Sequence, residues 1–157
     1  MFEHAVQEET FSKVKEYLGE LFEEPYHDPD NDHFYVRYGT TVLEISVEPH
    51  GPEEAVVRIM SYCVQDVEID EELLLGLLEL NHQLLVGSFS VVESDIFFAH
   101  SLYGRGLEPR DLLRAITSVA TLADDYDDKI VARYGGQTAL EKIQDTGGWR
   151  KRAGDVS

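Results

Sequence analysis

The chain has 157 residues, enough for one domain, and its 43% hydrophobic and 10% aromatic residues are typical of a globular rather than a disordered protein. Thirteen Lys and Arg against thirty-one Asp and Glu give a net charge of −18, which argues against direct binding to nucleic acid or to an anionic membrane. The single cysteine, Cys63, excludes an internal disulfide framework, and the acidic N-terminal sequence and the lack of long apolar runs lead us to expect a cytoplasmic protein.

The first predicted element is a helix in "TFSKVKEYLGELFEE", with Thr10 as its N-cap and with Pro25 and the loop 25–32 after its end. Three strands follow, in "HFYVRYG", "TTVLEISVE" and "AVVRIMSYCV". Gly39 joins the first strand to the second, and "HGPEE" at 50–54 joins the second to the third. Connections this short predict an antiparallel meander.

The second half of the chain alternates helix, hairpin and helix. A helix is predicted in "EIDEELLLGLLELNHQLL", with Asp70 as its cap. The strands "SFSVVE" and "IFFAHSLY" form a hairpin that turns at Ser94-Asp95. The longest helix has Pro109 in its first turn and ends at Gly135-Gly136.

A short helix at 138–145 completes the predicted order α-β-β-β-α-β-β-α-α. This order is typical of an α+β protein with an antiparallel sheet, here of about five strands. We expect one domain over residues 1–146 and a flexible tail over 147–157. The tail contains the basic run "WRKR" at 149–152, to which the sequence assigns no role.

Four aspartates in "ADDYDDKI" form a D-D-x-x-D pattern over 124–128, which binds magnesium–diphosphate in isoprenoid synthases. Helical periodicity places Asp125 and Asp128 away from the apolar side of the third helix, whereas Asp127 falls within that side and needs hydrogen-bond partners, from a loop or an arginine. Diphosphate chemistry requires a large all-helical cavity, and this chain is short and half strand. We therefore predict no metal site here, and a metal-dependent enzyme using these aspartates stays an alternative.

The loop "DPDND" places Asp28, Asp30 and Asp32 at the first three ligand positions of an EF-hand. His33 stands at the sixth position, where the motif has Gly, and Gly39 stands at the twelfth, where the motif has Glu. The six histidines form no metal-binding pair, and the sequence contains no nucleotide-binding or nucleophile motif. We therefore expect an acidic loop, no catalytic activity and no cofactor.

Two of the predicted strands carry apolar residues on both faces. The third strand has Val57, Ile59 and Cys63 on one face and Val56, Met60, Tyr62 and Val64 on the other, and the fifth has Ile96 and Phe98 opposite Phe97, Ala99 and Tyr103. A half-buried antiparallel strand is polar on its outer side, so an apolar second face needs a cover. The chain's own helices, a second subunit or a client segment could provide that cover.

Several motifs in the C-terminal half, taken in this order, resemble the YbjN family. They are L-x-x-L-N at 77–81, a strand start at Gly87, H-S-L at 100–102, G-L-x-P-x-x-L-L at 106–113 and D-x-x-V-A-R-Y-G-G at 128–136. That family is similar in fold to the chaperones of type III secretion. The resemblance covers about half of the chain. It implies a small acidic α+β protein, usually dimeric, that binds protein segments and does no chemistry.

We therefore predict a non-enzymatic protein-binding module, chaperone-like or regulatory, that captures a segment of a partner protein as a homodimer. Strand parity gives five candidate contact residues for the client or the dimer: Tyr35, Met60, Tyr62, Phe97 and Tyr103. Open sheet edges can add a strand, and the negative charge favours basic partners. The alternative is an adaptor in a nucleic-acid-handling or stress-response complex, which it would join through a protein partner.

Overall fold

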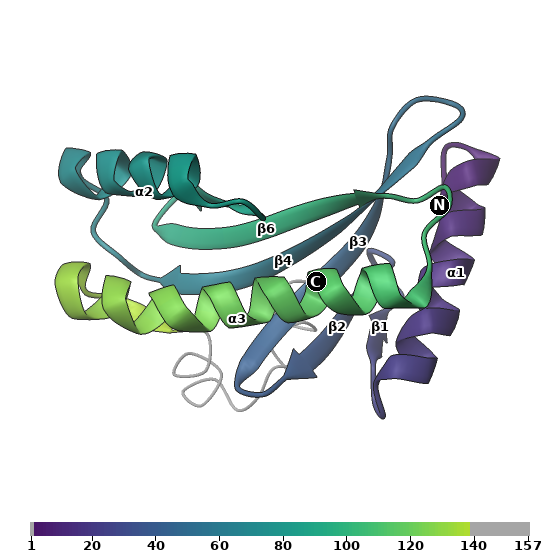
Figure 1. Ribbon diagram of the computed structural model, residues 1–157, viewed down its shortest axis with the longest axis horizontal. Helices are drawn as coiled ribbons and strands as arrows, with labels where there is room; N and C mark the ends of the chain where they lie inside the picture. Colours follow the sequence, from purple (N-terminus) through teal and green to yellow (C-terminus); the bar gives the residue numbers. More distant parts are fainter. Residues whose placement is uncertain (1, 139–157) are drawn as a thin grey trace.

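The computed structural model describes residues 2–138, which form one sheet and the helices that pack on it (Figure 1). The described helices are α1 (Ala5–Leu21), α2 (Glu71–Gln83) and α3 (Pro109–Tyr134). The described strands are β1 (Tyr26–Asp28), β2 (His33–Tyr38), β3 (Thr41–Pro49), β4 (Ala55–Gln65), β5 (Ser88–Val92), β6 (Asp95–Tyr103) and β7 (Gln137–Thr138). The architecture is therefore α+β, as the sequence predicts.

Every strand pair is antiparallel, and the strands lie in the order β1-β2-β3-β4-β6-β5. The strands β2, β3 and β4 form the predicted antiparallel meander, β1 extends it by one strand, and the β5–β6 hairpin joins the other side of β4. The two residues of β7 pair with Val64 and Gln65 at the end of β4, beyond the last pair that β4 makes with β3, Leu43↔Ser61. The chain therefore returns to the centre of the sheet after α3.

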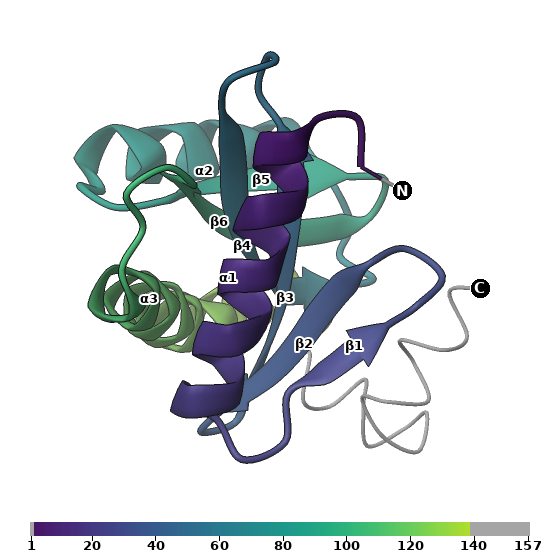
Figure 2. The ribbon, with the colours of Figure 1, turned by 90° about the vertical axis from the view of Figure 1, so that its right-hand side faces the viewer.

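The helices lie on one face of this sheet (Figure 2). The α3 helix crosses β3, β4 and β6, α1 contacts β3 and β4, and α2 lies beside β5. Buried side chains of α3 recur every three or four positions, which gives the apolar stripe that the helix packs on the sheet. They are Leu112, Ala115, Ile116, Val119, Ala120, Ala123 and Ile130.

Local signals in the sequence set the ends of the helices. Pro109 occupies the first turn of α3, and Glu108 and Asp111 form a capping box around it. Gly135, with φ of +83°, ends the same helix. Asp70 caps α2, where its carboxylate accepts a backbone N–H of the first turn at 2.9 Å. Pro109, Gly135 and Asp70 confirm the helix ends predicted from the sequence, whereas the capping box was not predicted.

Asn81 ties α2 to the outer edge of β5. Its Nδ2 donates to the carbonyl of Phe89 at 3.0 Å, and its Oδ1 accepts the N–H of Phe89 at 2.7 Å. Since these two backbone groups point away from β6, one side-chain amide satisfies them as a neighbouring strand would. Gly87 precedes β5 with φ of +75°, and a Cβ there would lie 2.5 Å from Phe98 Cζ. The start of β5 therefore requires glycine.

The first helix is longer than predicted. It begins at Ala5, with His4 at the N-cap position, and Thr10 lies inside it and donates its hydroxyl to the Val6 carbonyl at 2.7 Å. The side chain of Gln7 donates to the Val47 carbonyl at 3.0 Å and so holds the extra turn on β3. A search for local capping residues cannot find this tertiary contact. The prediction that Thr10 caps the first helix was therefore wrong.

The described sheet has seven strands rather than about five. Residues 26–28, predicted as loop, form β1, and β7 consists of two residues. Strands of two or three residues are too short to show the alternating pattern by which strands are found in a sequence. The turn of the β5–β6 hairpin lies at Glu93-Ser94, one residue earlier than predicted, and Glu93 has φ of +56°.

Three sequence predictions concern residues outside the described range. The short helix at 138–145 lies there except for Thr138, which belongs to β7. The flexible tail at 147–157 and the domain boundary at 146 lie there entirely. Among the helices that the structure does describe, none has the length and apolar character to cross a membrane.

Candidate functional site

The candidate site is the sheet face opposite to the helices, which we call the outer face. Strand pairing places a row of side chains across it, Tyr26↔Tyr35↔Glu44↔Met60↔Ala99. Beside this row lie Tyr62 and Phe97, which pair with each other, and Val42. These residues come from five strands and from both halves of the chain, so only the folded sheet brings them together.

Three hydrophobic side chains of the outer face are buried although they lie outside the core that the helices cover. Tyr35, Val42 and Phe97 expose 6%, 8% and 9% of their surface, and none of them belongs to the core cluster. The ring of Phe97 lies edge-on to that of Tyr62, with centroids 5.0 Å apart. The outer face therefore has an apolar centre of its own.

A carboxylate lies within this apolar centre. Glu44 Oε2 accepts the hydroxyl of Tyr62 at 2.9 Å and that of Tyr35 at 3.2 Å, and Oε1 lies 2.9 Å from His33 Nδ1. At this distance the His33 ring pairs with the carboxylate when the ring is protonated. Three partners are what a buried carboxylate needs to remain ionised.

The surroundings of Glu44 shift the pKa values of the cluster. Burial alone would raise the pKa of the Glu44 carboxyl, but the contacts from His33, Tyr62 and Tyr35 outweigh it and hold this pKa below its ordinary value. Contact with Glu44 raises the pKa of His33, against the opposing effect of burial. Burial and the charge of Glu44 raise the pKa of Tyr35. Near neutral pH, the site thus holds the Glu44 carboxylate beside the neutral phenol of Tyr35.

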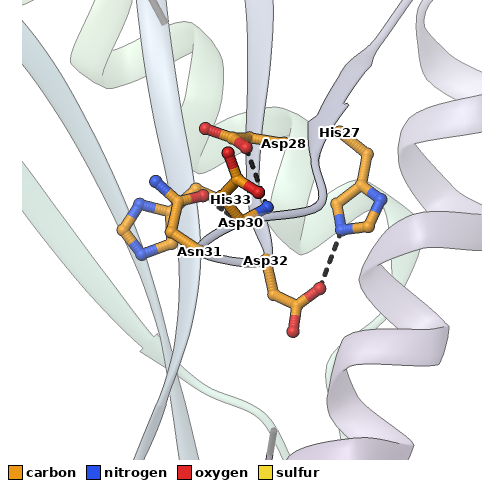
Figure 3. A network of polar contacts seen from close by, with 6 residues as sticks. All are labelled: His27, Asp28, Asp30, Asn31, Asp32 and His33. Carbon is orange, nitrogen blue, oxygen red and sulfur yellow. Dashed lines mark hydrogen bonds and ion pairs between the residues drawn. The ribbon is translucent and has the colours of Figure 1, made fainter. Parts of the chain in front are cut away.

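The β1–β2 turn borders the outer face and contains the EF-hand-like run (Figure 3). The carboxylate of Asp28 accepts the N–H of Asp30 at 2.9 Å, and Asp32 pairs with His27 Nε2 at 3.0 Å. These carboxylates stabilise the turn itself. Within residues 2–138, no three His, Cys, Asp or Glu side chains converge on a point that could hold a metal ion.

The aspartates of α3 lie on the helix side of the molecule, away from the outer face. Asp124, Asp125 and Asp128 are exposed, and Asp127 is half-buried, as the helical periodicity predicts. The side chain of Asp127 accepts the N–H of Asp128 at 2.6 Å, and Asp124 accepts the hydroxyl of Thr40 at 3.4 Å. The predicted loop or arginine partner of Asp127 stays a prediction.

Cys63 lies under α3, where its Sγ is 3.7 Å from the carbonyl oxygen of Ala123. Burial raises the pKa of this thiol, and the charge of Asp127 adds to the effect. A nucleophilic cysteine requires the opposite shift. The side chain therefore acts as a small hydrophobic group of the core, as the sequence indicates.

Two hollows lie on the helix side, along α3. One of about 390 Å³ lies between the first half of α3 and β6, lined among others by His100, Leu107 and Arg114. The other, of about 300 Å³, lies between α2 and the end of α3, lined by residues that include Leu80 and Tyr134. Both are shallow grooves between packed elements and are secondary candidates for a partner's side chain.

The structure places all five sequence-predicted contact residues on the outer face. Tyr62 and Phe97 are in ring contact, and Met60 and Tyr35 lie on either side of Glu44. Tyr103 has the same parity but lies at the far end of β6, where it pairs with Val56 and is 66% exposed. Strand parity thus groups the five residues correctly, and it leaves their distances along the strands undetermined. Their role in binding remains a prediction.

Strand parity assigns one residue to the wrong face of the sheet, and two residues of the outer face were not predicted as contact residues. A register shift in β4 between Tyr62 and Val64 turns Val64 into the helix-covered core, so assigning it to the outer face was wrong. Val42 and Glu44 belong to the outer face and were not among the predicted contact residues. Their alternation with Leu43 in "TTVLEISVE" is a signal that could have found them.

A family model described as "T3SS (YopN, CesT) and YbjN peptide-binding chaperone 1" matches residues 8–142. The chain belongs to this family. The match includes the sheet, α2, α3 and most of α1, and it confirms the resemblance seen in the C-terminal motifs. The family name describes peptide-binding chaperones, which agrees with a protein-binding role and gives no indication of catalysis.

A solved structure supports the same fold. The fold of this protein is similar to that of a chain in the solved structure "Structure of the HopA1-SchA Chaperone-Effector Complex", with a TM-score of 0.57 and 14% sequence identity. The similarity covers 75% of this chain and 94% of the other. At this identity it concerns the fold alone. No curated protein matches this chain.

Proposed function

We propose that this chaperone captures a segment of a partner protein on its outer face and performs no chemistry on it. The observation that supports this is the apolar centre formed by Tyr35, Val42, Met60, Tyr62 and Phe97 on the face opposite to the helices. Family membership supplies the class of ligand, a peptide. The neighbouring solved structure is of a chaperone with an effector, which is consistent with a protein client here.

An extended client has two ways to bind this surface. Its apolar side chains can contact Met60, Tyr62 and Phe97, and its backbone can pair with a strand at a border of the sheet. The β5 edge is engaged at Phe89 by Asn81, so we assign strand addition to the β1 edge. Because the face presents a buried carboxylate and the chain is strongly acidic, we expect client segments that combine apolar and basic residues.

We further propose that the chaperone is a homodimer held together by α2. Four leucines on or just after this helix are exposed, Leu74, Leu75, Leu78 and Leu85. They lie away from the outer face, so a dimer formed through them leaves the client surface accessible. The cytoplasmic location expected from the sequence is part of the same proposal.

Capture from a native lysate tests the client surface. A photo-crosslinking amino acid at position 60 samples the outer face, and the same group at position 78 samples α2 as a matched control. We expect position 60 to crosslink to client proteins and position 78 to the second copy. Replacing Phe97 with Ser should abolish client capture in a protein that remains folded by circular dichroism. Unchanged capture by this variant would contradict the proposal.

Two further measurements test the proposed dimer and the alternative of a metal-dependent enzyme. Light scattering should give a dimer for the wild type and a monomer after Leu75→Glu and Leu78→Glu, whereas a wild-type monomer would refute the α2 interface. Calorimetry with magnesium and with calcium tests the alternative metal-dependent enzyme. We expect neither heat nor thermal stabilisation, and a saturable signal lost on Asp124→Asn would favour the enzyme.

A further inference from the structure

The hollow of about 390 Å³ between β6 and the first half of α3 has a charge opposite to that of the chain. Its lining includes Arg105, Arg114 and His100, together with one acidic residue, Asp111. The loop that joins β6 to α3 lies at one end of it (Figure 1). The chain as a whole carries −18, so a lining with more arginines than carboxylates runs against its overall composition. Such a lining attracts anionic groups.

Two of the basic groups in this lining are available to a ligand. Within residues 2–138, the side chains of Arg114 and His100 have no hydrogen-bond or ion-pair partner. The carboxylate of Asp111 accepts the backbone N–H of Glu108 at 3.1 Å in the capping box of α3, so it is already engaged at the start of the helix. Arg114 is therefore a cation that the described part of the chain does not neutralise.

Two further cations are fixed beside the loop by backbone carbonyls. Nη1 of Arg105 donates to the carbonyl of Glu53 at 3.3 Å, and Nζ of Lys13 donates to the carbonyl of Gly104 at 3.0 Å. Neutral carbonyls hold these side chains in place without removing their charge. The Glu54 carboxylate accepts the backbone N–H of Arg105 at 3.1 Å and offsets part of the charge there. Arg114 is thus the main candidate to pair with an anion.

The other hollow along α3 does not offer such a cation. The hollow between α2 and the end of α3 is also lined by two basic residues, Lys129 and Arg133. Arg133 pairs with Glu72 at 2.6 Å, and the Nζ of Lys129 lies over the ring of Tyr126, 5.3 Å from its centroid. Both cations therefore already have partners, and the comparison singles out the hollow at Arg114.

Apolar side chains complete the lining beside Arg114. Leu107 and Ala115 are buried, at 5% and 4% exposure, and the half-buried Leu102 packs against the core. Ligand sites of about 300–1,000 Å³ typically combine an apolar lining with a few polar groups. The lining therefore fits a ligand with a carboxylate next to an apolar side chain, because an inorganic anion would leave the apolar wall in contact with water.

The overall charge of the chain does not prevent the approach of such a ligand. At physiological ionic strength, charges are screened over about 8 Å, so most of the acidic surface acts weakly on a group inside the hollow. A guanidinium in direct contact with a carboxylate forms two parallel charge-assisted hydrogen bonds. The local cations therefore determine which ligand binds.

We propose that this hollow binds an acidic segment of a partner protein. An Asp or Glu of the segment pairs with Arg114, His100 donates a further hydrogen bond, and the adjoining apolar side chain packs on Leu102 and Leu107. Family membership makes a polypeptide the class of ligand. The hollow lies on the helix side, so this binding does not require capture on the outer face. A client that uses both surfaces carries one basic and one acidic segment, and this last statement rests on the proposed function.

Binding of labelled peptides to the full chain tests the proposal by fluorescence polarisation. The probe is a short peptide blocked at both ends, with two glutamates on either side of a phenylalanine, and its control has glutamines instead. We expect saturable binding of the probe and binding of the control that is weaker by about tenfold or more, because the control loses the charge-assisted pair. Equal affinity of the two peptides, or no binding of either, would overturn the proposal.

Two arginine variants show whether the probe binds in the hollow. Arg114→Glu should weaken its binding by about tenfold or more. The matched control is Arg110→Glu, which makes the same change of charge on the same helix. Arg110 is not part of the lining and pairs with Glu108 at 3.0 Å, so the control should change the affinity by at most about twofold. Equal weakening by both variants would reduce the effect to net charge and contradict the proposal.

Two further variants separate this site from the outer face. Ser118→Trp fills the hollow without changing the charge and should abolish binding in a protein that remains folded by circular dichroism. Phe97→Ser should leave the affinity for the acidic probe unchanged, whereas loss of binding would place the probe on the outer face and refute the proposal. If the probe binds as expected and position 60 captures no client, the proposed function fails and this site stands. If position 60 captures clients and the probe does not bind, the reverse holds.

Discussion

Removing the charge of Glu44 tests whether the contacts of its carboxylate with His33, Tyr35 and Tyr62 stabilise the outer face. The substitution Glu44→Gln keeps the size of the side chain and one carbonyl acceptor, and it removes the charge that faces His33 and both tyrosine hydroxyls. Hydrogen bonds to a charged group contribute about 1.5–3 kcal/mol and neutral ones about 0.5–1.5 kcal/mol. Two weakened bonds and one lost ion pair, partly offset by the relief from burying a charge, give a loss of about 2 kcal/mol.

Thermal unfolding measures this loss. For a chain of this size, about 2 kcal/mol corresponds to a fall in Tm of about 6 °C. The control is Glu48→Gln, which lies on the same strand and face but is exposed, so its effect should stay within about 0.5 kcal/mol. Equal Tm values for the two variants would show that Glu44 does not hold the cluster together.

The effect should depend on pH in a defined window. The pKa of Glu44 is lowered from 4.5 in the folded state, so its contribution is present above pH 4.5 and is lost as the pH falls through the folded value. The pKa of His33 is raised from 6.5, so its contribution is present below pH 6.5 and is lost as the pH rises through the folded value. The difference between the wild type and Glu44→Gln should therefore be largest between about pH 4.5 and 6.5. A difference that is constant from pH 4 to 9 would contradict the assignment.

Three further predictions concern the scaffold. Asn81→Ala should destabilise the protein by about 2 kcal/mol in chemical denaturation, because it leaves the N–H and carbonyl of Phe89 without their partner, and an effect below about 0.5 kcal/mol would contradict the clamp. Gly87→Ala should lower Tm by more than any of the other variants, because a Cβ would collide with the Phe98 ring at a φ of +75°; a wild-type Tm would show that the start of β5 adapts. Cys63 should not react with a thiol reagent in the native state and should react fully in denaturant, whereas rapid native labelling would contradict its burial.

The elements that the sequence predicts well are those with a repeated local signal. The apolar stripe of α3 and the alternation in β4 and β6 each extend over nine or more residues, and the two ends of α3 carry Pro109 and Gly135. The β1 strand has no such signal, because three residues pair only after β2 provides an edge. The start of α1 depends on a contact between Gln7 and β3, which no local pattern contains.

The candidate site could be predicted in part for the same reason. Parity along β4 and β6 puts Met60, Tyr62 and Phe97 on one face, and the pairing of these strands then brings them together. Parity along "TTVLEISVE" also puts Glu44 on this face, but it does not show that this acidic residue, among several, lies at the centre. Only the pairing of β2, β3 and β4 places two tyrosine hydroxyls and His33 around it.

The amide of Asn81 has a consequence for how copies of this protein associate. By occupying the exposed backbone of Phe89, it closes one border of the sheet, and within residues 2–138 the short β1 strand forms the opposite border. Two copies that paired β1 to β1 would be left with β5 at both outer borders, where Asn81 occupies the backbone of Phe89, so pairing of copies would stop at two. Open-ended polymers built by border-to-border pairing are thereby prevented, which is valuable for a protein that binds extended chains.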